Sequence, residues 1–410
     1  MAKKRILCPY CFKHFFNVDA EYQCENNEVD VNMRAFCPTS PDEKFNNHWG
    51  FPVESRHIFK KKTLASSLFG AAPGPATCDV CGTETKRFVC PHCHNWLPSE
   101  MIAEGAEIVS IIGAPNSGKT VYFISLIHEL IKYGYKLGLT AIPKDEGPEK
   151  DKKTSMIYRE KSKALFEMNS LPEKTAPLGE NERSIPLIFS LTFKLPKSKL
   201  PKKTIYLVFY DTAGETFEDK EDMNMAKYLE ESSGIILLLD PYTIDPMRKT
   251  IENAVEVSDN VASSDEHHVL QRLLDYVSDA SKLKGKPLAL TFSKIDAFIN
   301  GLEASGQSIP GIDLESNSTF LKTGKFSLAH VDAIDSTLLG ALNEYCDGLG
   351  LRLRTTAESA FQEQNVKMFA VSSLGCNPNA DYTLDVVKPY RVLDPLIWVL
   401  YKMGFEFPVE

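Results

Sequence analysis

One segment, Gly113–Thr120, constrains the fold of this chain more than any other, because it reads G-x-x-x-x-G-K-T. The apolar run Glu107–Gly113 precedes it, and Val121–Tyr133 after it carries apolar residues at helical spacing. Glycines allow backbone N–H groups to wrap around a phosphate, and the N-terminus of the following helix adds a favourable dipole. The pattern therefore predicts a phosphate-binding loop between a buried strand and a helix.

From residue 106 onward, apolar runs of strand length alternate with helical patterns, which is typical of an α/β fold with a mostly parallel sheet. Leu187–Leu195 alternates in polarity and is expected at an exposed edge, whereas Thr204–Tyr210 is apolar and expected inside. Further strands are expected at Gly234–Leu239, Pro287–Phe292 and Lys367–Val371, with helices at about Thr154–Met168 and Leu393–Met403. With the loop, this order predicts the three-layer sandwich of a P-loop NTPase.

The cysteines divide the chain into regions, because eight of the ten lie within the first 93 residues. We expect a cysteine-rich module at 1–98, a joint at 99–105, and a nucleotide-binding domain at 106–410 with an insertion at about 143–201. In a reducing compartment, clustered cysteines favour metal binding over disulfides. The eight are Cys8, Cys11, Cys24, Cys37, Cys78, Cys81, Cys90 and Cys93.

Two C-x-x-C knuckles, Cys78–Cys81 and Cys90–Cys93, are close enough in sequence to supply four thiolates for one tetrahedral Zn²⁺ site. Gly82 after the first knuckle suits the left-handed backbone that such turns need. Cys8, Cys11, Cys24 and Cys37 are interpreted as a second zinc site, with His14 as an alternative ligand. An interleaved pairing, in which Cys8 and Cys11 join a later knuckle, stays open.

The phosphate loop predicts specific roles for the residues around it. Lys119 would neutralise β/γ-phosphate charge, and the Thr120 hydroxyl would bind Mg²⁺. Asp211 follows the strand Thr204–Tyr210 and could hold the same Mg²⁺, while Gly214 could bring a backbone N–H close to a γ-phosphate. The loop itself consists of Gly113, Ala114, Pro115, Asn116, Ser117, Gly118, Lys119 and Thr120.

Three further motifs resemble those of Ras-like and translation-factor-like GTPases, and each follows a predicted strand. The D-T-A-G sequence at 211–214 resembles the start of switch II. Ser293, Lys294 and Asp296 form S-K-x-D, which resembles the guanine-reading N/T-K-x-D element, in which the Asp carboxylate accepts from guanine. The S-S-L sequence of Ser372, Ser373 and Leu374 resembles the element that presents a backbone N–H to guanine O6. The resemblance implies GTP and GDP as ligands.

Two features depart from the Ras-like pattern. Glu215 stands where Ras-like enzymes have Gln, and its charge would repel a γ-phosphate, so hydrolysis is expected to be slow, partner-dependent or carried by another residue. The long interval between Lys119 and Asp211 must contain switch I. Thr175 is the candidate for the threonine that closes on Mg²⁺ and the γ-phosphate, with Thr154 as its rival.

The whole architecture, with cysteine knuckles before the GTPase motifs and the Arg391–Leu396 approach to a final apolar helix, resembles the prokaryotic double-GTPase family. Members are Ras-like P-loop proteins proposed to act beside partner ATPases and von Willebrand A-domain proteins in conflict or antiviral defence systems. The resemblance implies such a role here.

Composition limits the partners and the location that we expect. The net charge is −9 and no run of about 18 apolar residues occurs, so we expect no membrane span, and nucleic-acid binding is less favoured than a protein partner or self-association through the module. Met1–Arg5 is basic but is followed by Cys8–Cys11 instead of an apolar segment, which predicts no signal peptide and a cytoplasmic protein. The alternatives to a GTP-hydrolysing switch are a nucleotide-loaded scaffold with little turnover and a P-loop ATPase.

Overall fold

The computed structural model describes most of the 410 residues. The described residues are 3–26, 37–61, 74–114, 117–147, 152–173, 185–193, 204–210, 226–227, 229–254, 266–311, 317–379 and 382–409. Within them, no helix has the length and apolar character that crossing a bilayer requires.

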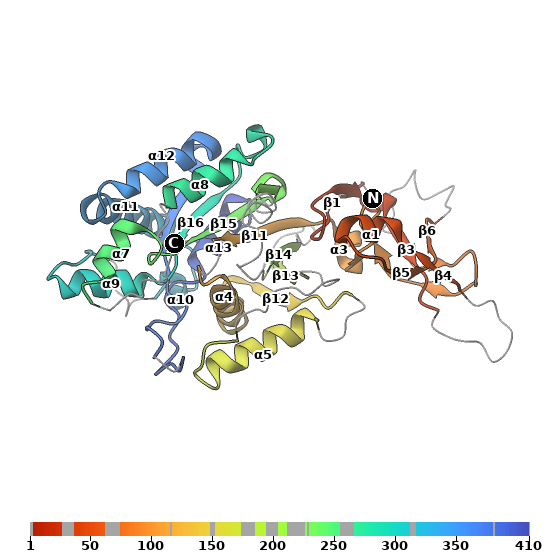
Figure 1. Cartoon of the computed structure of the whole chain (residues 1–410), viewed down its shortest axis with the longest axis horizontal. Helices are drawn as coiled ribbons and strands as arrows, with labels where there is room; N and C mark the ends of the chain where they lie inside the picture. The colour runs from red at the N-terminus through yellow and green to blue at the C-terminus, as the bar shows by residue number, and fades with distance from the viewer. Residues whose placement is uncertain are drawn as a thin grey trace.

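A seven-stranded mixed sheet forms the centre of the larger part of the chain (Figure 1). Its order is β12 (Leu139–Pro143), β13 (Leu187–Phe193), β14 (Thr204–Phe209), β11 (Glu107–Gly113), β15 (Gly234–Leu239), β16 (Leu288–Phe292) and β17 (Val366–Ala370). The pairs β12–β13 and β13–β14 are antiparallel, and the four remaining pairs are parallel. The mostly parallel sheet expected from the sequence is therefore confirmed.

Helices cover both faces of this sheet because alternate residues of each strand point to opposite sides. On β15, Ile236 and Leu238 pack in one apolar cluster, and Ile235, Leu237 and Leu239 pack in the other. The first cluster includes α4 (Lys119–Tyr133), α5 (Thr154–Phe166), α10 (Thr319–Thr323) and α13 (Asp394–Lys402). The second includes α7 (Asp245–Ile251), α8 (Glu266–Asp275), α9 (Ile295–Ala304), α11 (Leu328–Tyr345) and α12 (Leu349–Phe361).

The described residues from Lys3 to Leu97, here called the N-terminal module, lie at one end of the molecule (Figure 1). A four-stranded sheet has the order β10 (Trp96–Leu97), β9 (Phe88–Val89), β3 (Glu21–Gln23) and β6 (Ile58–Phe59). The described residues of the module also form three two-stranded antiparallel sheets: β1 (Arg5–Leu7) with β2 (His14–Phe16), β4 (Thr39–Pro41) with β5 (Glu54–Arg56), and β7 (Ala76–Thr77) with β8 (Glu84–Thr85). The module also contains α1 (Glu43–Trp49). The expected joint at 99–105 contains α3 (Ser99–Glu104), and single 3₁₀ turns lie at Asn17–Asp19, Gly134–Leu137, Ala280–Lys282 and Glu363–Asn365.

The N-terminal module packs directly on the central sheet. Tyr206 and Val208 of β14, Ile188 of β13 and Ile108 of β11 are buried in one apolar cluster with module residues such as Ile6. These strand residues point away from the cluster that contains α4. The module thus covers, on this half of the sheet, the face that helices α7, α8, α9, α11 and α12 cover on the other half.

One expectation about the sheet is wrong. Leu187–Leu195 was expected at an exposed edge, but β13 is internal, because β12 pairs with it on its outer side. Ile188 faces the N-terminal module and Phe189 faces the α4 side, so both faces of β13 are buried. The alternating pattern reflects two different coverings of the strand, in which Thr192 alone is only partly buried.

Candidate nucleotide and metal sites

The phosphate loop forms at the carboxyl end of β11, where the chain turns into α4. Gly118 lies just before the helix with a φ of +80°, a left-handed conformation that glycine adopts without strain. A Cβ atom on Gly113 would lie 2.7 Å from the carbonyl oxygen of Leu238 and 2.8 Å from Ser117 Oγ. Both glycines of the motif are therefore required by the local backbone. Pro115 and Asn116 fall outside the described residues.

The polar groups of this loop are arranged around its interior. Lys119 is buried, and its Nζ donates to the carbonyl oxygens of Gly113 at 2.8 Å and Ala114 at 3.1 Å. Ser117 is also buried, and its Oγ has no hydrogen-bond partner among the described residues. Thr120 occupies the first turn of α4. A bound phosphate would offer the acceptor oxygens that Lys119 and Ser117 can use.

Ser293 connects the phosphate loop to the next motif along the sheet edge. Its Oγ lies 3.0 Å from the carbonyl oxygen of Ser117 and 3.1 Å from that of Leu239, at the end of β15. The hydroxyl can donate to only one of these at a time. Ser293 thus holds the S-K-x-D element against the phosphate loop.

A cavity of about 270 Å³ opens beside the loop, and three motifs meet in it. Its lining includes Gly118 from the phosphate loop, Ser293, Lys294 and Asp296 from the S-K-x-D element, and Ser372, Ser373 and Leu374 from the segment after β17. The structure therefore brings residues from three distant parts of the sequence, such as Gly118, Asp296 and Leu374, to one cavity.

Asp296 is the most unusual group in this cavity. Its side chain is only 3% exposed, and Oδ1 has no hydrogen-bond partner within the described structure. Burial raises the pKa of the carboxyl, and a hydrogen bond with Ser372 partly opposes that shift. An unpaired buried carboxylate is costly, so a ligand with two adjacent N–H donors would satisfy it.

The rival threonine for switch I lies at the start of α5. Thr154 is buried there, and its Oγ1 accepts a hydrogen bond from the backbone N–H of Ile188. This contact ties α5 to β13. Other predicted site residues lie outside the described parts of the chain, namely Thr175, Asp211, Gly214 and Glu215.

Two clusters of four cysteines lie in the N-terminal module, and in each cluster all sulfur atoms are within 4.8 Å of one another. In the first, Cys8 and Cys93 are 3.8 Å apart at Sγ, as are Cys11 and Cys90. In the second, Sγ distances are 3.4 Å for Cys24–Cys81 and 3.9 Å for Cys37–Cys78. Four thiolates at this spacing form a closed tetrahedral set that fits a structural metal ion.

The favoured pairing of these cysteines is wrong, and the interleaved pairing that had stayed open is observed. The sequence favoured Cys8, Cys11, Cys24 and Cys37 in one site, but Cys8 and Cys11 join Cys90 and Cys93. The cause is strand order: β3 lies between β9 and β6, so the two halves of the module interdigitate. Cys24, at the end of β3, is thereby placed beside the Cys78–Cys81 knuckle.

Three knuckles share one turn geometry. The residue after each knuckle has a left-handed backbone, with a φ of 53° at Phe12, 76° at Gly82 and 51° at His94. The expectation for Gly82 is confirmed. Backbone N–H groups of Tyr10 and His92 each lie 3.4 Å from the sulfur of the cysteine two residues earlier, and they donate to it. Such bonds stabilise the thiolates that a metal requires.

The histidines of the module take other partners. His14 was an alternative ligand, but its Nε2 lies 3.0 Å from Glu231 Oε2, and it belongs to neither cluster. His94 lies between Asp42 and Glu21, with N–O distances of 2.6 and 2.9 Å. His92 Nε2 contacts the carbonyl oxygen of His14 at 3.2 Å.

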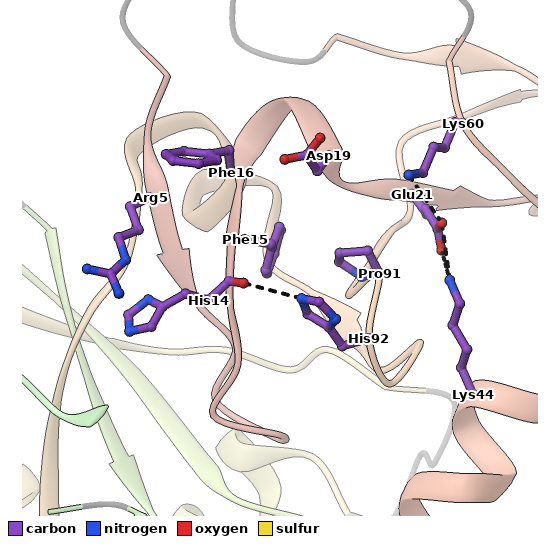
Figure 2. A pocket seen from close by; sticks show the side chains of 10 residues that line it. All are labelled: Arg5, His14, Phe15, Phe16, Asp19, Glu21, Lys44, Lys60, Pro91 and His92. Atoms are coloured by element: carbon purple, nitrogen blue, oxygen red, sulfur yellow. Dashed lines mark hydrogen bonds and ion pairs between the residues drawn. The ribbon is translucent and has the colours of Figure 1, made fainter. Parts of the chain in front are cut away.

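A second cavity, of about 430 Å³, lies beside the Cys90–Cys93 knuckle (Figure 2). Charged groups of both signs line it. Glu21 pairs with Lys44 at 3.0 Å and with Lys60 at 3.8 Å, so opposite charges neutralise each other at one end. This charge arrangement does not single out an anionic or a cationic ligand.

Comparison with known proteins identifies the family. The model of the Double-GTPase 2 family matches residues 107–340, more than half of the chain. The chain belongs to this family. The matched region contains the phosphate loop, the 211–214 motif and the S-K-x-D element, so a GTPase-like domain is present. The family predicted by resemblance is confirmed.

Individual relatives are more distant. A putative ESX-1 scaffolding and assembly protein, SaeC, of Mycolicibacterium smegmatis is 24% identical over 330 residues, covering 77% of this chain and 80% of that protein. Among solved structures, the GTP-bound GTPase-like domain of S. cerevisiae Ski7 is 14% identical with a TM-score of 0.30, covering 73% of this chain and 51% of that one. This chain thus spans about half of the Ski7 chain. The G domain of the T. maritima FeoB iron transporter is 12% identical with a TM-score of 0.27, covering 73% and 99%.

Several residues that line the cavity beside the phosphate loop of this Double-GTPase 2 protein were not predicted from the sequence. Tyr242, from the turn after β15, lines it, and its hydroxyl donates to Asn377 Oδ1 at 3.3 Å. Its position just after a parallel strand was the available signal. Leu171 lines the same cavity because residues 169–171 pair with residues 382–384, through Leu171 N–H to Tyr382 O at 3.1 Å and Leu384 N–H to Asn169 O at 2.7 Å. No local pattern indicated that contact.

Proposed function

We propose that this protein binds GTP and GDP with Mg²⁺ and acts as a nucleotide switch whose hydrolysis of GTP is slow or stimulated by a partner. The observation that carries the proposal is the buried Asp296 carboxylate with its unpartnered Oδ1 in the cavity beside the phosphate loop. Guanine presents N1–H and its exocyclic amine side by side to such a group. Adenine lacks this pair of donors and would leave the carboxylate unsatisfied.

The phosphates would occupy the loop ahead of α4. Lys119 would exchange the carbonyl oxygens of Gly113 and Ala114 for phosphate oxygens, and Ser117 Oγ would gain a partner. Thr120 and Asp211 would hold Mg²⁺, which neutralises charge between the β- and γ-phosphates. We assign Gly214 to a γ-phosphate contact and Thr175 to switch I. Glu215, which departs from the Gln of Ras-like enzymes, would orient the attacking water.

The two cysteine clusters would each hold Zn²⁺ in a structural role. Each cluster supplies four thiolates, which leaves no open coordination position for a substrate or water. The zinc ions would brace the N-terminal module, whose described strands each have only two or three residues. Elemental analysis of the purified protein tests this assignment, and a chain that retains no zinc would contradict it.

Calorimetric titration with GTP, GDP and ATP tests the switch proposal. We expect GTP and GDP to bind in the presence of Mg²⁺ and ATP to bind much more weakly. Lys119→Ala serves as the control that loses the phosphate contacts. Equal binding of ATP would overturn the assignment of guanine as the preferred base.

A nucleotide-loaded scaffold is the second candidate, and the name of the mycobacterial relative favours it, because that protein is described as a putative scaffolding and assembly protein. In this case the N-terminal module would dock a protein partner or a second copy of the chain. Measurement of phosphate release discriminates the two: a scaffold would bind GTP and release no more phosphate than Lys119→Ala. A role in antiviral defence stays a prediction from family resemblance, to be tested by phage challenge of cells with and without the gene.

A further inference from the structure

The N-terminal module contacts the chain immediately before Asp211. Tyr210 follows β14, and its hydroxyl donates to the carbonyl oxygen of Pro9 at 2.6 Å. The carbonyl oxygen of Tyr10 lies 3.4 Å from the same hydroxyl. The ring of Tyr210 also lies 6.2 Å from the ring of Phe12, between centroids. The residue next to Asp211 in the chain is therefore fixed to the Cys8–Cys11 knuckle.

The same part of the module contacts the chain again beyond residue 228. His14 Nε2 lies 3.0 Å from Glu231 Oε2. Glu231 also pairs with Lys282 at 2.7 Å, and Lys286 donates to the carbonyl oxygen of Leu229 at 3.1 Å. These contacts hold residues 229–231 in one place. The module therefore contacts the described chain at Tyr210 and again at Glu231.

Both contacts belong to a single cysteine cluster. Pro9 and Tyr10 lie between Cys8 and Cys11, and Phe12 closes their turn. His14 is tied to the partner knuckle, because His92, between Cys90 and Cys93, contacts its carbonyl oxygen (Figure 2). A metal ion in this cluster would therefore set the relative position of the two contacts, whereas the Cys24, Cys37, Cys78 and Cys81 cluster takes part in neither.

We propose that Tyr210 and His14 are positioning residues through which the Cys8, Cys11, Cys90 and Cys93 site controls the rate of GTP hydrolysis. This inference rests on the proposed GTPase function, in which Asp211 would bind Mg²⁺, Gly214 would contact the γ-phosphate and Glu215 would orient the attacking water. Small displacements of groups at a reacting centre reduce rates strongly. Metal loss or a missing contact should therefore slow hydrolysis and leave the base cavity, formed by other elements, able to bind.

The strand β14 offers a matched control for the Tyr210 hydroxyl. Tyr206 lies on the same face of the same strand and is fully buried against the module. Its hydroxyl has no hydrogen-bond partner among the described residues. Tyr206→Phe and Tyr210→Phe remove the same atom from the same interface, and only the second removes the contact with the knuckle.

Single-turnover GTP hydrolysis and GDP affinity of the full-length chain test the proposal. We expect Tyr210→Phe to slow hydrolysis by about tenfold while GDP affinity changes by less than about twofold. Tyr206→Phe should match the wild type in both. Glu231→Gln, which weakens the second contact, should also slow hydrolysis with GDP affinity retained. Equal rates for Tyr210→Phe and Tyr206→Phe would overturn the proposal.

A second measurement separates failure of this inference from failure of the proposed function. If the wild type binds no GTP, the GTPase proposal fails. The contact between Tyr210 and the Cys8–Cys11 knuckle can then still be tested by the rate at which the protein releases zinc. Zinc release to a colorimetric chelator should be faster from Tyr210→Phe than from Tyr206→Phe, because one knuckle has lost a tie to β14. Identical rates of zinc release from the two variants would show that Tyr210 does not position the Cys8–Cys11 knuckle.

Discussion

The Nζ atom of Lys294 lies 2.6 Å from Oδ2 of Asp240, and this ion pair fixes the lysine along one wall of the base cavity. Asp240 is 2% exposed and directly follows β15, and its Oδ1 accepts a hydrogen bond from the backbone N–H of Tyr242 at 3.0 Å. Lys294 Nζ also lies 5.4 Å from the centroid of the Tyr242 ring. One carboxylate thus orders both the lysine and the tyrosine that line the cavity.

Asp240→Asn tests whether nucleotide binding depends on the contacts by which Asp240 positions Lys294 and Tyr242. The amide still accepts from Tyr242 but no longer neutralises Lys294, so the lysine stem should sample more rotamers. We expect GTP affinity to fall by about tenfold, equivalent to about 1.4 kcal/mol. Calorimetric titration measures the change, and unaltered affinity would mean that Lys294 does not contact the base.

Asp296→Asn should change the preferred nucleotide from GTP to XTP. Hydrogen bonds to a charged group contribute about 1.5–3 kcal/mol each, so guanine affinity should fall by about a hundredfold. Xanthine carries a carbonyl where guanine carries its amine, and an amide can donate to it. Competition between GTP and XTP measures the exchange, and retained GTP preference would remove Asp296 from base recognition.

The same substitution should stabilise the protein without nucleotide. Because burial raises the pKa of Asp296, the folded chain binds this proton more tightly than the unfolded chain does. The ionised carboxylate therefore destabilises the fold at neutral pH, and Asp296→Asn removes that penalty. We expect a melting temperature a few degrees higher at pH 7.5, with the difference shrinking as the pH is lowered towards the usual range of an aspartate.

Glu129 of α4 gives a second pH-dependent effect. It is 5% exposed, and burial raises the pKa of its carboxyl to about 7 from an ordinary value of 4.5. The free energy of unfolding should therefore fall as the pH rises from about 4.5 to about 7 and change little from this group above that. At pH 8, Glu129→Gln should be more stable than the wild type by roughly 1–3 kcal/mol.

Denaturant unfolding at pH 5 and pH 8 measures that difference. The matched control is Glu303→Gln on the exposed side of α9, which should leave stability within about 0.5 kcal/mol at both values. If Glu129→Gln gave the same small change at both pH values, Glu129 would be accessible to water.

Paired cysteine substitutions test the interleaved metal clusters. Cys11→Ser with Cys90→Ser affects one cluster, so the protein should keep one zinc ion of the two expected. Cys11→Ser with Cys24→Ser affects both clusters and should leave none. Elemental analysis counts the ions. A pairing in sequence order would reverse the two results.

The sequence predicted elements whose signal is local. The strand at Glu107–Gly113 and the helix after Lys119 were found because apolar spacing and the glycine pattern are contained in a few residues. The position of β13 inside the sheet was not predicted, because its neighbours β12 and the N-terminal module come from distant parts of the chain.

The same division applies to the sites. Asp296 and Ser372 could be placed in one cavity because both follow parallel strands, whose carboxyl ends share an edge. Tyr210 was predicted only as the end of a strand, since its partner Pro9 is about 200 residues away and no spacing encodes that contact. The cysteine pairing failed for the same reason: it depends on the order of strands in a sheet.

The apolar face that β13 and β14 present to the N-terminal module bears on how this chain could be shortened or rearranged. Deleting the first hundred or so residues would expose Ile188, Tyr206 and Val208 to water, as the same residues would be exposed in a nascent chain that lacked its beginning. Synthesis from the N-terminus means that the cysteine-rich module is already made when those strands emerge. Recombination that separated the module from the sheet would leave this apolar face uncovered, so we expect the two to be inherited as one piece.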